Sequence, residues 1–478
     1  MSLKHPPETT HPSARISCAA STDIHGMVPA ATRPLERTAA AERRAAFPFR
    51  FPRDTRRLGG RFTVEENAKR LQRLFLFERC VAHGLGSWTL TIPDFEVKVE
   101  TGRHIFWHMD AARQLRQRLT EQECRLEQID GFRDPDIEAL IEEALSAADS
   151  PELLAGMHHV IGRALQTAYR RHIEDTCPIA DAPTIRVLRQ ILVDYEGMLE
   201  WADLAVAAYE HASDGARLAT WRFHLEAVLQ AIGGVSGTEQ PTSMPESLRA
   251  RQQPYVRGSI PCRDARFITF TNTGSYDAFD GTLRHELETY AYDRLTFIRA
   301  QRDEIDAIEA FGTFLWDLRF RNFDAELALA RITWDETRHT ELGHRSMQIM
   351  GYDPFELPNR LTSSTCRGPM EPAVAMAEIN LFGEVGVMKS IPGMIANAQK
   401  HGDGLLSHVS DFIRSDERTH VRNGQRILAI ATSLDLPALV LETRKAFTRC
   451  LVELGAIETG GDPGFILSRE DIEHLVGE

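Results

Sequence analysis

The chain has 478 residues, of which 42% are hydrophobic and 26% are charged, and its formal net charge at pH 7 is −14. A chain of this composition buries a large core, and its length suits two or three domains. No apolar run has the length of a membrane-spanning helix, and the acidic balance disfavours a nucleic-acid backbone or an anionic membrane as the main partner.

The seven cysteines lie far apart, and none belongs to a CxxC pair. An odd number of scattered thiols disfavours both a disulfide framework and a thiolate zinc site. The N-terminal residues contain no apolar segment of the kind found in secretory signals. We therefore expect a cytoplasmic protein with reduced cysteines.

The first half of the chain is predicted to be mostly helical. Residues 1–45 are rich in Ala, Thr, Pro, Arg and Ser, which predicts a disordered tail. A helical N-terminal domain is predicted over 46–233, with a short strand near 88–99. Residues 234–280 are rich in Gly, Ser, Pro, Thr and Asn, which predicts a linker or a lid. The helices of this half are expected at 64–84, 100–123, 135–148, 151–175, 183–213 and 216–232.

The second half carries a clearer helical pattern. The connection between its second and third helices is about twenty residues long, well beyond the median loop of a compact domain. A short, a long and a short loop are the order found in a four-helix bundle with one crossover, the ferritin-like topology. We therefore predict an all-α protein with a ferritin-like domain at 281–460 and a C-terminal tail at 461–478. The helices of this half are expected at 281–301, 322–350, 371–399, 403–432 and 436–456.

Two helices of the second half share the motif D-E-x-x-H-x-x-x-G-x-R, found at 335–345 and 416–426. A Glu and a His three residues apart project from one face of a helix, so both can reach one metal ion. Glu336 with His339, and Glu417 with His420, occupy positions where the helical period demands apolar residues. Because a buried carboxylate needs a partner or a metal, the pattern predicts a metal site.

These polar residues have a structural interpretation as well. A salt-bridged polar core with Arg338 and Arg418 is the structural alternative, and it is disfavoured because polar groups matched on four helices seldom serve structure alone. A further E-x-x-H match, Glu341 with His344, lies off the apolar stripe of its helix and is predicted to be solvated.

A site for two metal ions needs carboxylates from the other two helices as well. The apolar stretch of the third helix carries only two charges, Glu378 and Glu384, and Glu384 lies between two glycines that leave room for a cluster. The first helix offers Glu286 or Glu288. Both flank its apolar stripe, so periodicity leaves this choice open.

The order Glu, E-x-x-H, crossover, Glu, E-x-x-H resembles the signature of the ferritin-like di-iron carboxylate superfamily, over about 281–430. The D-E-x-R-H form at 335–339 looks like that of ribonucleotide reductase small subunits and bacterial multicomponent monooxygenases. A second likeness is to compact ferritin-like bacterial proteins that include tRNA hydroxylases. Alignment of the helices by this resemblance favours Glu286 over Glu288.

The resemblance implies a ligand set for two iron ions, with a manganese–iron pair as an alternative. Glu336 and Glu417 would bridge the ions, Glu286 and Glu384 would be terminal ligands, and each histidine would bind one ion. Four carboxylates and two divalent ions make a neutral cluster, which suits a buried site. Oxygen ligands with imidazole favour iron or manganese over metals that prefer thiolates.

Three further residues are predicted to contact the ligands without binding a metal themselves. Asp335 and Asp416 fit the role of accepting the free imidazole N–H of the histidine on the opposite helix. Arg338 lies in the same motif and is expected beside them, whereas the exchanged order at Arg418 and Thr419 leaves the equivalent arginine of the second copy in doubt.

The resemblance implies O2-dependent oxidation of a small organic substrate by hydroxylation, N-oxygenation or desaturation. Electrons would come from an external donor, because the sequence has no flavin or nicotinamide fingerprint. One alternative is a tRNA-modifying hydroxylase, against which the acidic charge counts. Another is a ferritin-like metal-binding or peroxide-scavenging protein without an organic substrate. The sequence also allows a homodimer.

The N-terminal half offers one weaker candidate site. Glu100, His104 and His108 follow one another at four-residue spacing, which a second metal site would allow. No E-x-x-H occurs near Glu196 or Glu200, where a duplicated bundle would need one. Core or surface histidines are the favoured interpretation, and the sequence leaves open whether this half is a decayed bundle or an unrelated domain.

Overall fold

The computed structural model describes residues 60–212, 215–271 and 273–456. The contacts between residues divide the chain at Arg57–Leu58, and every described residue belongs to the second unit. The tails predicted at 1–45 and 461–478 lie outside the described residues. The described part is mostly helical and has only two strands of two residues each, which confirms the all-α prediction.

The first half forms helices close to those predicted. The Thr63 hydroxyl accepts a hydrogen bond from the Glu66 N–H at 3.2 Å, and the Glu66 carboxylate accepts one from the Thr63 N–H at 2.8 Å, so a capping box starts the first described helix. The chain continues as a π-helix, η2, after α6. The elements are α2 (Val64–Trp88), α3 (Phe95–Thr120), α4 (Leu126–Asp130), α5 (Pro135–Leu145), α6 (Ser150–Leu154), η2 (Ala155–Gly162), α7 (Arg163–Asp175), α8 (Ala182–Ala212) and α9 (Gly215–Ala231).

The strand predicted near 88–99 was wrong. Thr89 and the residues after it form a turn, and α3 begins at Phe95. Phe95, Val97 and Val99 alternate as in a strand, but all three are buried on a helix, together with Lys98 between them. Helix packing therefore outweighs the local strand preference of these apolar residues.

The second half differs from the prediction mainly in its first helix. The helix expected at 281–301 is interrupted after Glu286, and a further helix, α13, follows directly after Glu304. The elements are α10 (Arg249–Gln252), β1 (Thr269–Phe270), α11 (Thr273–Glu286), α12 (Thr289–Asp303), α13 (Ile305–Asp317), α14 (Phe323–Ile349), β2 (Asn359–Arg360), α15 (Thr362–Arg367), α16 (Pro372–Ala377), η3 (Glu378–Gly383), α17 (Glu384–Lys400), α18 (Gly404–Ala431) and α19 (Leu436–Glu453).

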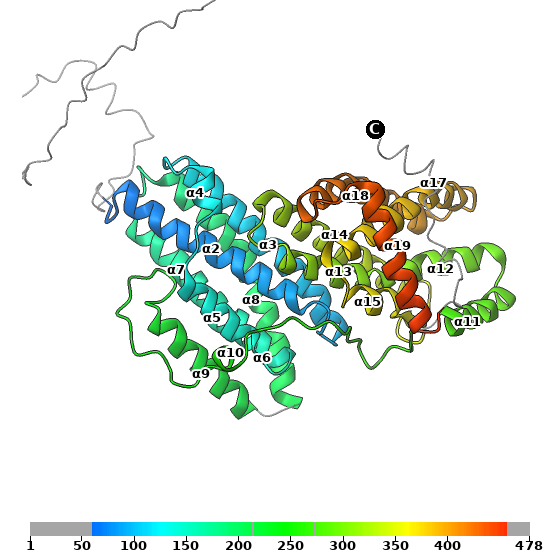
Figure 1. Ribbon diagram of the computed structural model, residues 1–478, viewed down its shortest axis with the longest axis horizontal. Helices are drawn as coiled ribbons and strands as arrows, with labels where there is room; N and C mark the ends of the chain where they lie inside the picture. Colours follow the sequence, from blue (N-terminus) through cyan, green and yellow to red (C-terminus); the bar gives the residue numbers. More distant parts are fainter. Residues whose placement is uncertain (1–59, 213–214, 272, 457–478) are drawn as a thin grey trace, which may run out of the picture. The chain divides into compact units, whose positions relative to one another are not determined.

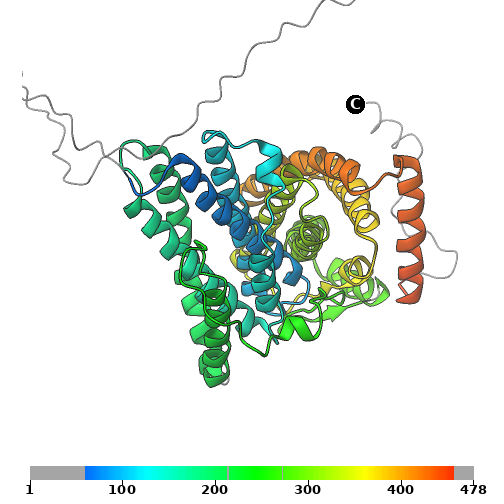
Figure 2. The same cartoon turned by 60° about the vertical axis from the view of Figure 1, so that its left-hand side comes forward.

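The helix α14 lies at the centre of the packing in this half (Figures 1 and 2). It contacts α12, α13 and α18, while α18 contacts α17, η3 and α16. These contacts join α12 with α13, α14, α18, and the segment of α16, η3 and α17 into one group of packed helices. Whether this group is a ferritin-like four-helix bundle stays a prediction.

The first half packs directly against these helices of the second half: α2 lies alongside α13, and α3 lies alongside α14 (Figure 1). A buried ion pair joins the two halves. The Arg79 Nε and Nη2 donate to the Glu326 carboxylate at 2.6 and 2.8 Å, and His83 Nε2 lies 2.9 Å from the same carboxylate. All three side chains are buried, so both charges are compensated away from water.

The segment predicted as a linker or lid is held in place by charged side chains. Lys98 on α3 donates to the Cys262 carbonyl oxygen at 2.9 Å and contacts Glu309 on α13. Arg263 contacts Glu309 as well, and Arg257 pairs with Asp317. A two-residue parallel pairing of β1 with β2 ties this segment to the crossover.

Within the described residues, no single helix is both long and apolar enough to cross a membrane. Only α18 and α19 taken together pass by length and composition, and they are bent by 93° relative to each other.

Candidate metal centre

The two copies of the repeated motif bring their Glu and His side chains into one buried group. Glu336 and His339 come from α14, Glu417 and His420 come from α18, and none of the four is more than 2% exposed. They interrupt the predicted apolar stripes, whose other members are buried except for the half-buried Met350. The buried side chains are Ala325, Leu329, Ile332 and Met347 on α14, and Leu406, Val409, Ile413 and Ile427 on α18.

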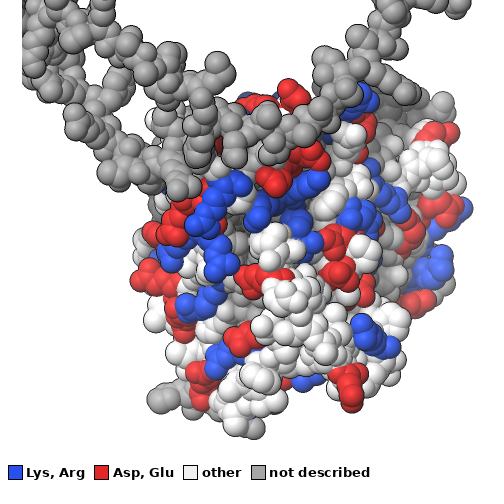
Figure 3. All heavy atoms as spheres, turned by 90° about the vertical axis from the view of Figure 1, so that its left-hand side faces the viewer, with Lys and Arg blue, Asp and Glu red and all other residues white. Residues whose placement is uncertain are grey.

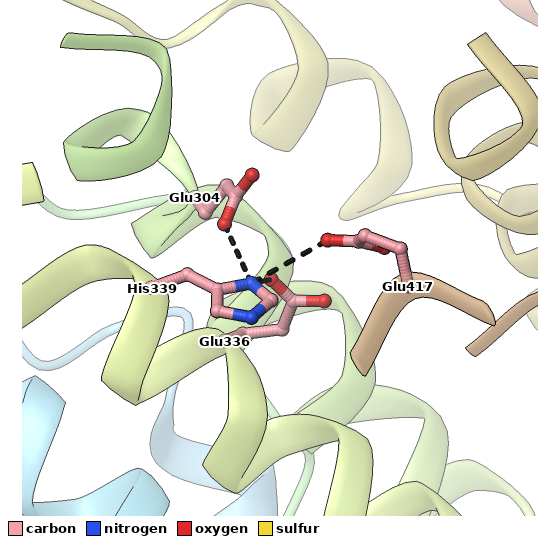
Figure 4. Close-up of side chains that lie close together, drawn as sticks. All are labelled: Glu304, Glu336, His339 and Glu417. Carbon is pink, nitrogen blue, oxygen red and sulfur yellow. Dashed lines mark ion pairs between the residues drawn. The ribbon is translucent and has the colours of Figure 1, made fainter. Parts of the chain in front are cut away.

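The ring of His339 faces three carboxylates (Figure 4). Its Nδ1 lies 2.9 Å from Glu304 Oε2, 3.4 Å from Glu336 Oε2 and 3.5 Å from Glu417 Oε1. We call these four residues the His339 group. Their ligand atoms all lie within 4.8 Å of one another, which is close enough to hold one metal ion.

The ring of His420 faces a second set of three carboxylates. Its Nδ1 lies 3.2 Å from Glu336 Oε1, 3.2 Å from Glu417 Oε2 and 3.8 Å from Glu384 Oε1. These four residues are the His420 group, and they meet the same 4.8 Å criterion. The two rings lie side by side, with 5.9 Å between their centres.

The two groups share Glu336 and Glu417. Each of these carboxylates presents one oxygen to His339 and the other to His420. Glu304 and Glu384, in contrast, each approach a single histidine. The arrangement is therefore that of two ligand sets joined by two central carboxylates.

Several buried atoms of the cluster make no hydrogen bond. They include the Nδ1 atoms of both histidines and one oxygen each of Glu304 and Glu417. Among the described residues, no Lys or Arg pairs with any of the four glutamates, so the salt-bridged core does not form, and Arg418 is exposed. Buried carboxylates and ring nitrogens that point at one another without a hydrogen bond suit a bound cation.

Protonation reflects the same crowding of charge. Burial raises the pKa of Glu304 to about 8, against the opposing effect of His339. Burial and the neighbouring carboxylates raise the pKa of Glu384 well above its ordinary value. Burial alone would raise the pKa of Glu417, but the hydrogen bond with Glu384 and the charge of His420 lower it to about 2. Without ions, protons therefore neutralise part of the cluster.

Each histidine contacts an aspartate of the opposite helix through the ring nitrogen that points away from the glutamates. His339 Nε2 lies 3.3 Å from Asp416 Oδ2, and His420 Nε2 lies 3.4 Å from Asp335 Oδ2. Arg338 joins these two carboxylates, because it contacts Asp335 and donates to Asp416 at 2.7 Å. Each aspartate thus lies where the sequence places it, and its role as support for a metal ligand stays a prediction.

These contacts also bear on where the rings carry their protons. Burial would lower the pKa of both histidines, but the neighbouring carboxylates raise it well above its ordinary value, so without ions each ring carries a proton on both nitrogens. Burial would raise the pKa of Asp335, but the bonds with His420 and Arg331 lower it well below its usual range. An ionised carboxylate at Nε2 favours the imidazole proton on that nitrogen. The Nδ1 atom, which faces the glutamates, is then free to bind a cation once the extra ring proton leaves.

The structure corrects the ligand predicted from the first helix. Glu286 and Glu288 are both exposed and belong to neither group, and Glu304 takes the place assigned to Glu286. Glu304 lies at the junction of α12 and α13, so the interrupted helix determines its position. We therefore replace Glu286 by Glu304 in the candidate ligand set, and the other five predicted ligands lie within the cluster.

A signal for Glu304 is present in the sequence. Residues equally distant from the loop of an antiparallel helix pair face each other. Glu304 and Glu336 are both sixteen residues from Phe320, which lies in the loop between α13 and α14. Extending the predicted first helix through the apolar pattern at 305–317 would have placed Glu304 opposite Glu336, and Glu286 far from it.

The other polar candidates lie outside the cluster. Glu378 at the start of η3 is buried and pairs with Arg367. Glu341 pairs with Arg103 and Arg345, and the ring of His344 stacks on Phe95 with 4.7 Å between the ring centres. Both residues of this E-x-x-H match are half-buried, whereas the sequence predicted that they are solvated.

The histidines of α3 are core residues, as the favoured interpretation expects. His108 Nδ1 lies 2.6 Å from the buried Glu78 carboxylate, and His104 Nδ1 lies 3.1 Å from His158 Nε2. His104 Nε2 is 3.9 Å from Glu100. Within the described residues, these side chains do not form a group of three ligands close enough to hold a metal ion.

Comparison of the chain with known protein families, with curated proteins and with solved structures finds no match.

Proposed function

We propose that the protein is a non-haem di-iron oxidoreductase that uses O2 to oxidise a small organic substrate. The observation that supports this proposal best is the sharing of Glu336 and Glu417 between the His339 group and the His420 group. Two carboxylates that each offer one oxygen to either side suit a pair of ions.

The donor set favours iron or manganese. Each group contributes carboxylate oxygens and one imidazole nitrogen, and neither contains a cysteine. Four carboxylates balance two divalent ions, which suits a site whose bridging glutamates are at most 2% exposed. A pair of redox-active ions bound there would supply the activation of O2 and the two-electron chemistry.

The side chains of the protein would hold, orient and shield this pair. Glu304 with His339, and Glu384 with His420, would bind one ion each from opposite sides. Asp416 keeps the ring of His339 in position by accepting its Nε2–H. Burial of the cluster excludes bulk water, so the bound pair would be shielded from the solvent.

Anaerobic loading with Fe(II), followed by removal of free iron and elemental analysis, tests the site. We expect two irons per chain, and an optical change when the loaded protein meets O2. Replacing His420 by Ala should remove at least one iron while the far-UV circular dichroism stays helical. Glu341→Gln, which changes a glutamate on the same helix as Glu336 but outside the cluster, is the matched control and should retain two irons.

The alternatives give different results in the same experiment. Oxidation of many irons per chain would indicate storage, and consumption of hydrogen peroxide without need of an organic substrate would indicate scavenging. On the face shown in Figure 3, basic side chains are interspersed with acidic ones, which does not favour a phosphate backbone on that face. Retention on tRNA at physiological salt would contradict our preference for a small substrate.

A further inference from the structure

The repeated motif contains one residue that the ligand set does not use, the glycine four residues after each histidine. Gly343 follows His339, and Gly424 follows His420. Both glycines are buried and lie one helical turn beyond the histidine, on the same face. Each therefore faces the rod that carries the outer glutamate of its own group.

Gly343 lies against the backbone of α12. A Cβ atom at this position would come within 2.2 Å of the Arg302 nitrogen and 2.8 Å of the Gln301 carbonyl carbon. Arg302 precedes Glu304 by two residues. The backbone there cannot easily move away, because the Arg302 guanidinium donates to the carbonyl oxygens of Leu357 and Pro358 at 2.9 and 2.7 Å.

Gly424 lies against η3 in the same manner. A Cβ atom at this position would come within 2.0 Å of Asn380 Oδ1 and 2.5 Å of Asn380 Cγ. Asn380 precedes Glu384 by four residues. Its side chain is buried and donates to the Met376 carbonyl oxygen at 3.0 Å, so it fits only in the space that the glycine leaves.

We propose, on the premise of the two-ion site proposed above, that each glycine is a positioning residue for one ion. Gly343 lets α12 approach α14 closely enough to bring Glu304 to the His339 group. Gly424 lets η3 approach α18 closely enough to bring Glu384 to the His420 group. Each copy of the motif thus contains three parts: a glutamate shared by both groups, a histidine of one group, and a glycine whose close helix contact brings in the glutamate that belongs to that group alone.

Single substitutions test this division. Gly343→Ala should lose the ion of the His339 group and retain the other, so that anaerobic Fe(II) loading gives one iron per chain. Gly424→Ala should also give one iron per chain, or bind its second iron at least tenfold more weakly, because a side chain yields more readily than a backbone. Gly393→Ala on α17, where a Cβ would meet no atom within 4 Å, is the control and should bind two irons.

Double variants identify which ion is lost. Gly343→Ala combined with Glu304→Gln should still bind one iron, because both changes affect the same group. Gly343→Ala combined with Glu384→Gln should bind none. A merely structural effect of the alanine would weaken both ions alike and would not distinguish the two combinations.

A compensating change separates the two glycines. Asn380→Gly removes every side-chain atom that obstructs an alanine at Gly424, so this pair of changes should restore the second iron. No side-chain removal can restore Gly343→Ala, because the obstructing atoms belong to the backbone of α12.

The far-UV circular dichroism of each variant shows whether it folds. If Gly343→Ala does not fold, the iron content of the milder variant Gly424→Ala decides the test. Two irons with wild-type affinity in a folded Gly424→Ala, or loss of both irons, would overturn the inference. A wild type that binds no iron would instead refute the proposed function on which it depends.

Discussion

Replacing Glu304 by Gln tests the ligand that takes the place predicted for Glu286. The change removes one carboxylate from the His339 group and leaves all four ligands of the His420 group in place. We therefore expect the variant to bind one iron instead of two. Glu286→Gln is the matched control, because Glu286 was the ligand predicted from the sequence and is exposed.

The size of the effect follows from mass action. An ion at a free concentration of a hundred times its dissociation constant stabilises the folded chain by about 2.7 kcal/mol. Two such ions would stabilise the wild type by roughly 5 kcal/mol, and the variant would retain about half of this gain. Without ions the change should be small, about 1 kcal/mol or less, because burial raises the pKa of Glu304 to about 8 and the carboxyl is already protonated at pH 7.

Elemental analysis and denaturant unfolding, each with and without iron, measure both quantities. The predicted pattern is near-equal stability of wild type and Glu304→Gln without iron, and a gap of about 2.7 kcal/mol with iron. Two irons in Glu304→Gln, or loss of an iron in Glu286→Gln, would refute the placement of Glu304 as a ligand.

Three further results are expected. Asp416→Asn should weaken iron binding about 10- to 100-fold in equilibrium titrations, because it removes the carboxylate that orients His339, and an unchanged affinity would contradict this role. Iron binding should release protons and become tighter as the pH rises toward 8, because the ion competes with the proton on Glu304. Calorimetry in buffers of different ionisation enthalpy measures the number of protons released. An iron affinity that does not change with pH would contradict this competition. Arg79→Met should lower the free energy of unfolding by about 3–5 kcal/mol, because it leaves Glu326 buried without its arginine, and a second change, Glu326→Leu, should recover much of the loss in the same denaturation experiment.

Most of the candidate site was predictable because it depends on local geometry. A Glu and a His three residues apart share a helix face whatever the rest of the fold, so Glu336 with His339 and Glu417 with His420 stand out against their apolar stripes. Glu384 stands out for another reason, because it is one of two charges in the apolar stretch of its helix and lies between two glycines. None of these inferences needed contacts between helices.

The first-helix ligand could not be read in this way. Periodicity does not say where a helix is interrupted, and the break after Glu286 moves the rod that enters the cluster to α12 and α13. The helical period does not predict the π-helix η3 either, although α17 begins directly after it with Glu384.

The sequence by itself determined the helical class, the repeated motif, the two supporting aspartates and five of the six clustered side chains, because each follows from the residue pattern along one helix. Tertiary structure decided that Glu304, and not Glu286, completes the cluster, and that α2 and α3 pack against α13 and α14. Those features depend on the register between helices, which close contacts such as those at Gly343 and Gly424 set and which no single helix encodes.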